Sequence, residues 1–101
     1  MKSSLSLDFT DEARRDFRAI LRYTRKIWGD HQRNRYAAQL DDELSRLIIF
    51  PLLGEARDEL APGMRSRVVA EHVIYDRIGE EAITVHRILH QSMDAKAHIK
   101  D

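Results

Sequence analysis

The sequence predicts an α+β domain with an N-terminal strand, an antiparallel two-helix hairpin and a three-stranded antiparallel meander. Three observations support this prediction. Leu5, Leu7 and Phe9 alternate with polar residues, two long stretches repeat apolar residues three and four apart, and three strand-like runs follow between residues 65 and 89, the last of them rich in β-branched side chains. We expect the hairpin to pack on one sheet face, and the 101 residues to form a single domain, 1–101.

The first predicted helix spans Asp11–Trp28. Thr10 is the expected N-cap, since its hydroxyl can accept from a free amide of the first turn, and Gly29 is expected to end the helix. The apolar stripe consists of Ala13, Phe17, Ile20, Leu21, Thr24, Ile27 and Trp28, and the opposite side carries Arg14, Arg15, Arg18, Arg22, Arg25 and Lys26. This basic side is typical of a solvated surface, with a docking surface as the alternative.

The second predicted helix spans His31–Phe50, with Asp30 as its cap and Pro51 at its end. Only one or two residues separate it from the first helix, so the two must fold back as an antiparallel hairpin. Its apolar stripe consists of Tyr36, Ala37, Leu40, Leu44, Leu47 and Ile48.

The strand runs at 65–70, 72–78 and 82–89 carry apolar residues on both sides, whereas a sheet with one solvated face should alternate more cleanly. A helical hairpin covers only one face. The second face must therefore meet either a partner segment or the chain's own tail and 52–64 link, and the sequence leaves both open.

The amino-acid composition excludes several classes of function. Seventeen basic and seventeen acidic residues give a net charge of zero, so nucleic-acid binding through bulk charge is not expected and any basic surface must be local. Without cysteine there is no disulfide or thiolate site, and no apolar run is long enough for a membrane span or signal peptide. We expect a cytoplasmic protein that binds no membrane.

Four arginines and three histidines fall in or near the predicted sheet: Arg65, Arg67, Arg77, Arg87, His72, His86 and His90. Arginines beside a titratable ring could hold a phosphate and move a proton during RNA cleavage, but arginine is equally an ordinary strand-edge residue. The spacing of His86 and His90 within a strand does not fit a metal pair, and no cofactor motif occurs, so neither a metal nor a cofactor is expected.

Several ordered pieces resemble the ParE toxins of bacterial type II toxin–antitoxin modules, within the ParE/RelE superfamily. The resemblance spans about Leu5 to Ile99. The most specific pieces are Pro62-Gly63-x-Arg65-Ser66 and Arg87-Ile88-Leu89-His90-x-x-Met93-Asp94, supported by Trp28-Gly29 and His72-Val73-Ile74. One departure is Asp76, which stands where the family pattern has an aromatic and puts partner specificity in question.

The resemblance implies a non-enzymatic toxin that inhibits DNA gyrase and replication. It also implies neutralisation by an antitoxin whose C-terminal segment wraps the toxin, with no sequence-specific nucleic-acid binding. A RelE-like, ribosome-dependent messenger-RNA nuclease is the alternative, and an inert binding module is the third possibility. Candidate partner-binding residues are Trp28, Arg65, Arg67, Tyr75, Arg87, His90, Met93 and Asp94.

Overall fold

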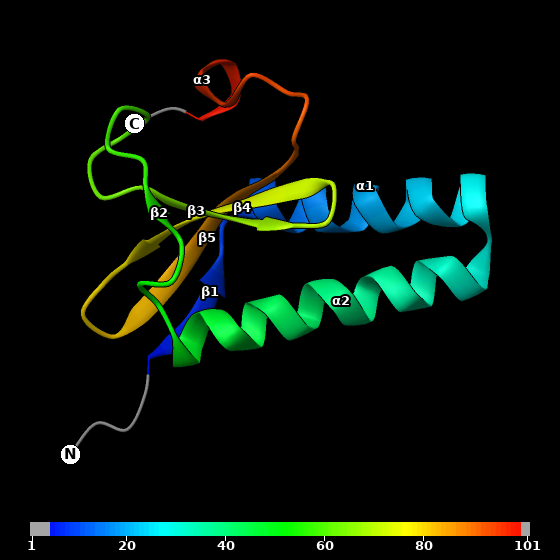
Figure 1. The fold of residues 1–101 in the computed structure, drawn as a ribbon, viewed down its shortest axis with the longest axis horizontal. Coiled ribbons are helices and arrows are strands. Elements are labelled where there is room, and N and C mark those ends of the chain that lie inside the picture. The colour runs from blue at the N-terminus through cyan, green and yellow to red at the C-terminus, as the bar shows by residue number, and fades with distance from the viewer. Residues whose placement is uncertain (1–4, 100–101) are drawn as a thin grey trace.

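The computed structural model describes residues 5–99 (Figure 1). The elements, in chain order, are β1 (Ser6–Phe9), α1 (Asp11–Trp28), α2 (Asp30–Ile49), β2 (Glu55–Ala56), β3 (Arg65–Val69), β4 (His72–Ile78), β5 (Ala82–His90) and α3 (Ala95–His98). The α+β class and the order of strand, helical hairpin and meander are thus confirmed.

The strands form one mixed sheet in the order β1-β5-β4-β3-β2. The predicted antiparallel meander is its centre. The sequence did not predict the two edges: β1 lies parallel to β5, with Leu7 opposite Ile83, and the short β2 lies antiparallel to β3. The first strand of the chain therefore pairs with the last, and the helical hairpin belongs to the crossover that connects them.

The helix ends follow local chemistry. Thr10 caps α1, as predicted, by accepting a hydrogen bond from the Ala13 amide at 3.0 Å. Gly29 turns the chain with a φ of +94°, a conformation that glycine adopts without strain. The prediction that Asp30 caps α2 was wrong, because Gly29 occupies the cap position and Asp30 is the first helical residue. No helix within residues 5–99 is long and apolar enough to span a membrane.

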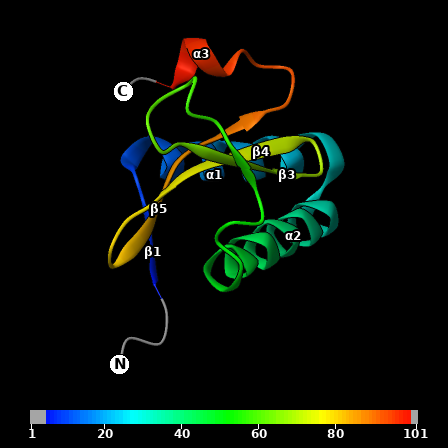
Figure 2. The same cartoon turned by 60° about the vertical axis from the view of Figure 1, so that its left-hand side comes forward.

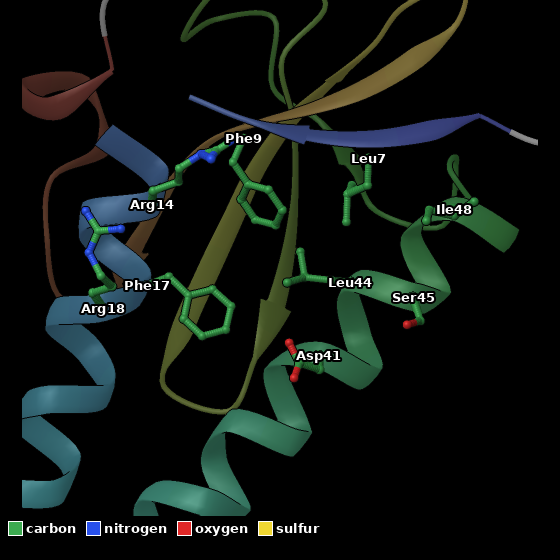
Figure 3. A pocket seen from close by; sticks show the side chains of 9 residues that line it. All are labelled: Leu7, Phe9, Arg14, Phe17, Arg18, Asp41, Leu44, Ser45 and Ile48. Atoms are coloured by element: carbon green, nitrogen blue, oxygen red, sulfur yellow. The ribbon is translucent and has the colours of Figure 1, made fainter. Parts of the chain in front are cut away.

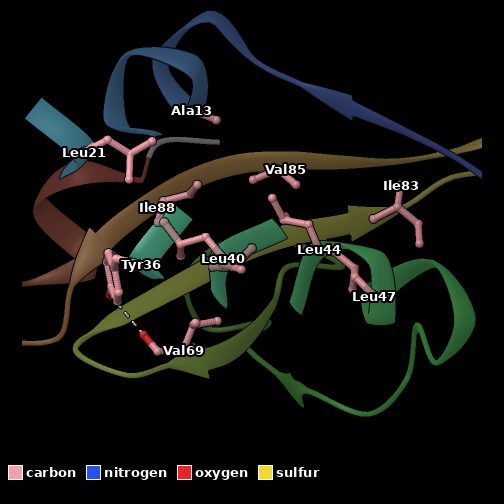
Figure 4. Packing of buried hydrophobic residues seen from close by; sticks show 11 residues of the cluster. Ala13, Leu21, Tyr36, Leu40, Leu44, Leu47, Val69, Ile83, Val85 and Ile88 are labelled. Carbon is pink, nitrogen blue, oxygen red and sulfur yellow. Dashed lines mark hydrogen bonds between the residues drawn. The ribbon is translucent and has the colours of Figure 1, made fainter. Parts of the chain in front are cut away.

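The main core lies between the hairpin and one face of the sheet (Figure 4). The predicted helical stripes supply Ala13 and Leu21 from α1 and a longer row from α2. The sheet supplies the opposing layer of β-branched side chains. The residues with no exposed surface are Ala13, Leu40, Leu47, Ile74, Ile83 and Val85.

The opposite face of the sheet has its own core, which resolves the question that the sequence left open. The chain covers this face itself, with residues from the 52–64 link and from the tail around α3, on the side away from α2 (Figure 2). Of the two possibilities that the sequence left open, the structure shows cover by the chain's own tail and 52–64 link, and not a face that needs a partner segment. The cluster consists of Ala61, Met64, Tyr75, Leu89, Ala95 and Ile99, flanked by Leu60 and Val73.

The two long helices are joined at one end and diverge toward the other (Figure 1). The cause lies in the sheet: α1 packs on β5, whereas α2 contacts β3, and β4 lies between these two strands. Two strand spacings amount to roughly 10 Å. The helices therefore separate where they meet the sheet, and their joined tip extends beyond it.

Candidate partner-binding site

An apolar groove occupies the space between the diverging helices, with a volume of about 520 Å³. Leu7 and Phe9 of β1, Phe17 of α1 and Leu44 of α2 point into it (Figure 3). Its rim is polar and charged, formed by Arg14, Arg18, Asp41 and Ser45. A groove with an apolar floor and a charged rim suits an amphipathic segment better than a small polar ligand.

Sequence reasoning did not single out this groove. Phe17, Leu44 and Ile48 were placed in the helical stripes and interpreted as core. The stripes locate them correctly on the inner sides of the helices. The two helices cover different strands and therefore diverge. The divergence leaves part of these three side chains uncovered in the groove.

Large apolar side chains are also exposed on the last turns of α1, toward the tip of the hairpin. Trp28 is 70% exposed and Tyr23 64% exposed, with Ile27 between them in sequence. Trp28, a predicted partner-binding residue, therefore does not anchor the hairpin core. Large aromatics left in water are characteristic of protein-binding surfaces.

Two predicted site residues on β3 are instead engaged within the fold. The Arg65 guanidinium donates to the carbonyls of Gly54 and Leu52 at 2.6 and 3.1 Å. Arg67 is buried, pairs with Glu43 at 3.2 Å and donates to the Phe50 carbonyl at 2.8 Å. Both side chains fasten the chain that leaves α2 against the sheet.

Arg87, the third predicted arginine, joins three parts of the chain. Its guanidinium grips Asp16 of α1 through two hydrogen bonds, at 2.7 and 3.0 Å, and donates to the His98 carbonyl of the tail at 3.0 Å. The Asp16 carboxylate also accepts the Ile88 amide at 3.0 Å. Its hydrogen bonds with Asp16 raise the pKa of Arg87 further above its usual range, so the guanidinium remains charged.

Asp76, the departure from the family pattern, lies on the core side of β4 and is 1% exposed. Arg65 is its partner in the strand register, and Arg67 faces the same side of β3. One carboxylate oxygen of Asp76 has no hydrogen-bond partner. Burial raises the pKa of Asp76 to about 6, against the attraction of Arg67 and Arg65. Asp76 is thus a buried residue and not a direct surface contact.

The remaining predicted residues surround the end of β5. Tyr75 is buried beneath the guanidinium of Arg57, 5.9 Å from its ring centroid. The His90 ring accepts the Ser92 amide at 3.1 Å, and Asp94 caps α3 by accepting the Lys96 amide at 3.1 Å. Met93 is 45% exposed. Of the two apolar side chains in this group, Tyr75 is buried and Met93 is open to a partner. Among residues 5–99 no cluster of side chains could hold a metal ion.

Comparison with known proteins defines the class. Residues 7–95 match the family model described as the ParE toxin of the type II toxin–antitoxin system parDE. The chain is 37% identical over 94 residues to the toxin ParE of Escherichia coli, covering 91% of this chain and 90% of that protein. It is 32% identical over 87 residues to toxin ParE1 of Caulobacter vibrioides, covering 86% and 90%.

A solved structure agrees with the fold. A chain of the chromosomal ParDE system from P. aeruginosa aligns with a TM-score of 0.74 at 20% identity, over 85% of this chain and 95% of that one. This likeness shows that the two chains share the same α+β fold. Together with the family match, this shows that the chain belongs to the ParE toxin family of type II toxin–antitoxin systems, as the sequence resemblance indicated.

Replacing Asp16 by asparagine should lower the free energy of unfolding by about 2 kcal/mol, because the change removes the negative charge from a two-pronged, largely buried ion pair. Urea unfolding followed by circular dichroism measures this loss. Asp8→Asn on the exposed side of β1 is the matched control and should change stability by less than about 0.5 kcal/mol. Equal effects of the two variants would contradict a special role for Asp16.

Asp76→Asn should change stability in a pH-dependent way. The folded-state pKa of Asp76 is raised, so the folded chain holds its proton more tightly than the unfolded chain. Ionisation of Asp76 therefore lowers the free energy of unfolding of the wild type as pH rises from about 4 to about 6. The asparagine side chain does not ionise, so the variant does not lose this stability. Relative to wild type, the variant should gain about 2 kcal/mol between pH 4 and pH 7, measured by urea unfolding at each pH. A constant difference would contradict burial of the carboxyl group.

Proposed function

We propose that this ParE-family toxin inhibits DNA gyrase without catalysing a reaction, and that a cognate antitoxin neutralises it by binding the groove between α1 and α2. The family match carries this proposal. The apolar groove and the exposed aromatic side chains near the tip support it, because exposed apolar surface is characteristic of protein-binding sites.

The arrangement of the arginines supports a binding protein over a nuclease. Phosphoryl transfer to a 2′-hydroxyl needs cationic groups that are free to approach a phosphate. Arg65, Arg67 and Arg87 are each held by carbonyls or carboxylates of the fold itself. These bonds give the three arginines a structural role, since they stabilise the sheet and its connections.

The groove favours an amphipathic antitoxin segment with an acidic edge. Its apolar floor can bury the segment's hydrophobic side chains, and Arg14 and Arg18 on the α1 rim can pair with acidic residues. The chain's own cover on the opposite sheet face removes the reason for placing the partner there.

The gyrase proposal is tested with the purified chain, DNA gyrase and relaxed plasmid. We expect loss of supercoiling together with trapped, cleaved DNA. Trp28→Ala should weaken this inhibition about tenfold, because exposed aromatics dominate protein interfaces. Val68→Ala, another exposed apolar residue but on β3, is the matched control and should leave inhibition unchanged. Normal supercoiling by gyrase in the presence of the chain would contradict this proposal. Cleaved messenger RNA in a toeprinting assay would then support the nuclease function instead.

The groove proposal is tested with Ser45→Trp, which places a bulky side chain at the exposed rim without touching the core. Affinity for the antitoxin encoded in the reading frame adjacent to its gene should fall at least about tenfold, measured by isothermal titration calorimetry. The matched control is Gln39→Trp, an exposed position of α2 outside the groove lining. Unchanged affinity for Ser45→Trp would contradict antitoxin binding in the groove.

A further inference from the structure

The solvent-facing side of α1 carries a continuous stripe of cations. At about 100° per residue, its six members fall within an arc of roughly 120°, and they extend about 18 Å along the helix axis. Every member is exposed. The basic stripe consists of Arg14, Arg15, Arg18, Arg22, Arg25 and Lys26.

Acidic side chains lie at the two ends of this stripe, with Asp11 and Glu12 in the first turn of α1 and Asp30 beside Arg25, and not along its length. Between Arg14 and Lys26 the only acid is Asp16, which lies outside the arc and is bound to Arg87. The outer surface of α2 differs, since its exposed residues include the cation Arg35 beside the acids Asp41 and Asp42. A chain with zero net charge therefore concentrates its positive charge on one helix face, the local basic surface that its composition still allowed.

The stripe is also free to bind. Within residues 5–99, Arg25 is its only member in an ion pair, with Asp30 at 2.8 Å. Both partners of that pair are about 70% exposed, at 69% and 74%, so water screens it and Arg25 can exchange partners readily. Five of the six cations are arginines, whose planar guanidinium groups match phosphate oxygens in a two-pronged geometry.

We propose that this face of α1 binds duplex DNA without sequence specificity, through the phosphates on both sides of the major groove. A helix is about 10–12 Å across with its side chains, and the major groove is about 12 Å wide. The hairpin projects beyond the sheet as a convex rod, so α1 can approach a groove without obstruction from the strands (Figure 1). The width of the arc lets Arg14 and Arg25 reach one backbone and Arg15 and Lys26 the other.

Charge density favours DNA over an acidic protein surface. A duplex presents about ten phosphates over 18 Å of axis, a continuous match to six cations on one helix face. Shape favours the duplex over a single strand, because the stripe is convex, whereas proteins bind single strands in a cationic groove that follows one backbone.

The stripe and the antitoxin groove share two residues, Arg14 and Arg18. A segment seated in the groove would pair with these two arginines and lie along one edge of the stripe. DNA binding and antitoxin binding therefore exclude each other at this end of α1. The other four cations lie outside the groove lining, which allows the two surfaces to be changed separately.

The test measures binding of the full chain to a fluorescein-labelled 20-base-pair duplex by anisotropy, without gyrase, so its result does not depend on gyrase inhibition. We expect the logarithm of the affinity to fall steeply with the logarithm of salt concentration between 50 and 200 mM. The double variant Arg15→Gln with Arg22→Gln should bind at least about tenfold more weakly at 50 mM salt, and its salt slope should be shallower by about two.

The matched control is Arg35→Gln with Lys96→Gln, which removes the same charge from exposed positions on α2 and α3 and should retain wild-type affinity within about twofold. Polyglutamate and single-stranded DNA of the same length serve as competitors. No duplex binding at 50 mM salt, an equal loss in the control variant, or stronger competition by polyglutamate or the single strand than by unlabelled duplex would each overturn the proposal. Gyrase inhibition that persists in a variant unable to bind DNA would leave the proposed function intact.

Discussion

The fold depends on the contact between Asp16 and Arg87. The two side chains join the first helix to the last strand, 71 residues apart in sequence, and the same carboxylate and guanidinium also hold the Ile88 amide and the His98 carbonyl. The strand is irregular here, because Tyr75 pairs with Arg87 and Asp76 with Val85, so His86 has no partner of its own on β4. The Thr10 hydroxyl binds the His86 carbonyl at 2.8 Å. The ion pair and the helix cap thus fix the bulge, the helix and the tail in one arrangement.

Because Asp16, Arg87 and Thr10 are bonded within the fold, a partner must bind through the shape of the surface and through its exposed charges. The helices cover most of one sheet face and the chain's own link and tail cover the other, but Leu7 and Phe9 of β1 stay open to a partner in the groove between the helices. The helical hairpin differs, because its two helices follow separate strands and its tip projects beyond the sheet. It offers an apolar groove, an aromatic tip and a basic face within one motif. The proposed binding function would use these surfaces together, by fitting several parts of a large assembly at once.

The sequence predicted the elements well because their signals are local. Apolar periodicity located both helices, and Thr10 and Gly29 marked their limits within a residue. The parallel pairing of β1 with β5 carries no local signal, since it joins residues 75 or more apart. The site was harder still. Arg65, Arg67 and Tyr75 were chosen for their chemistry and their motifs, but chemistry alone cannot distinguish an arginine that holds a carbonyl from one that meets a partner. Groove residues such as Phe17 carry the same apolar signal as core residues.

The pairing of the first strand with the last has a consequence for how the toxin is made. Leu7 lies opposite Ile83, so the sheet edge that starts the chain cannot form until almost the whole chain has been synthesised. Because protein synthesis proceeds at about 5–20 residues per second, the residues that pair with β1 are added on the order of 4 to 15 s after β1 itself. Asp16 waits equally long for Arg87. A nascent chain therefore passes through an interval in which both helical segments have been synthesised but the floor of their groove is unfinished. An antitoxin made beforehand could meet each new toxin molecule as soon as it completes folding.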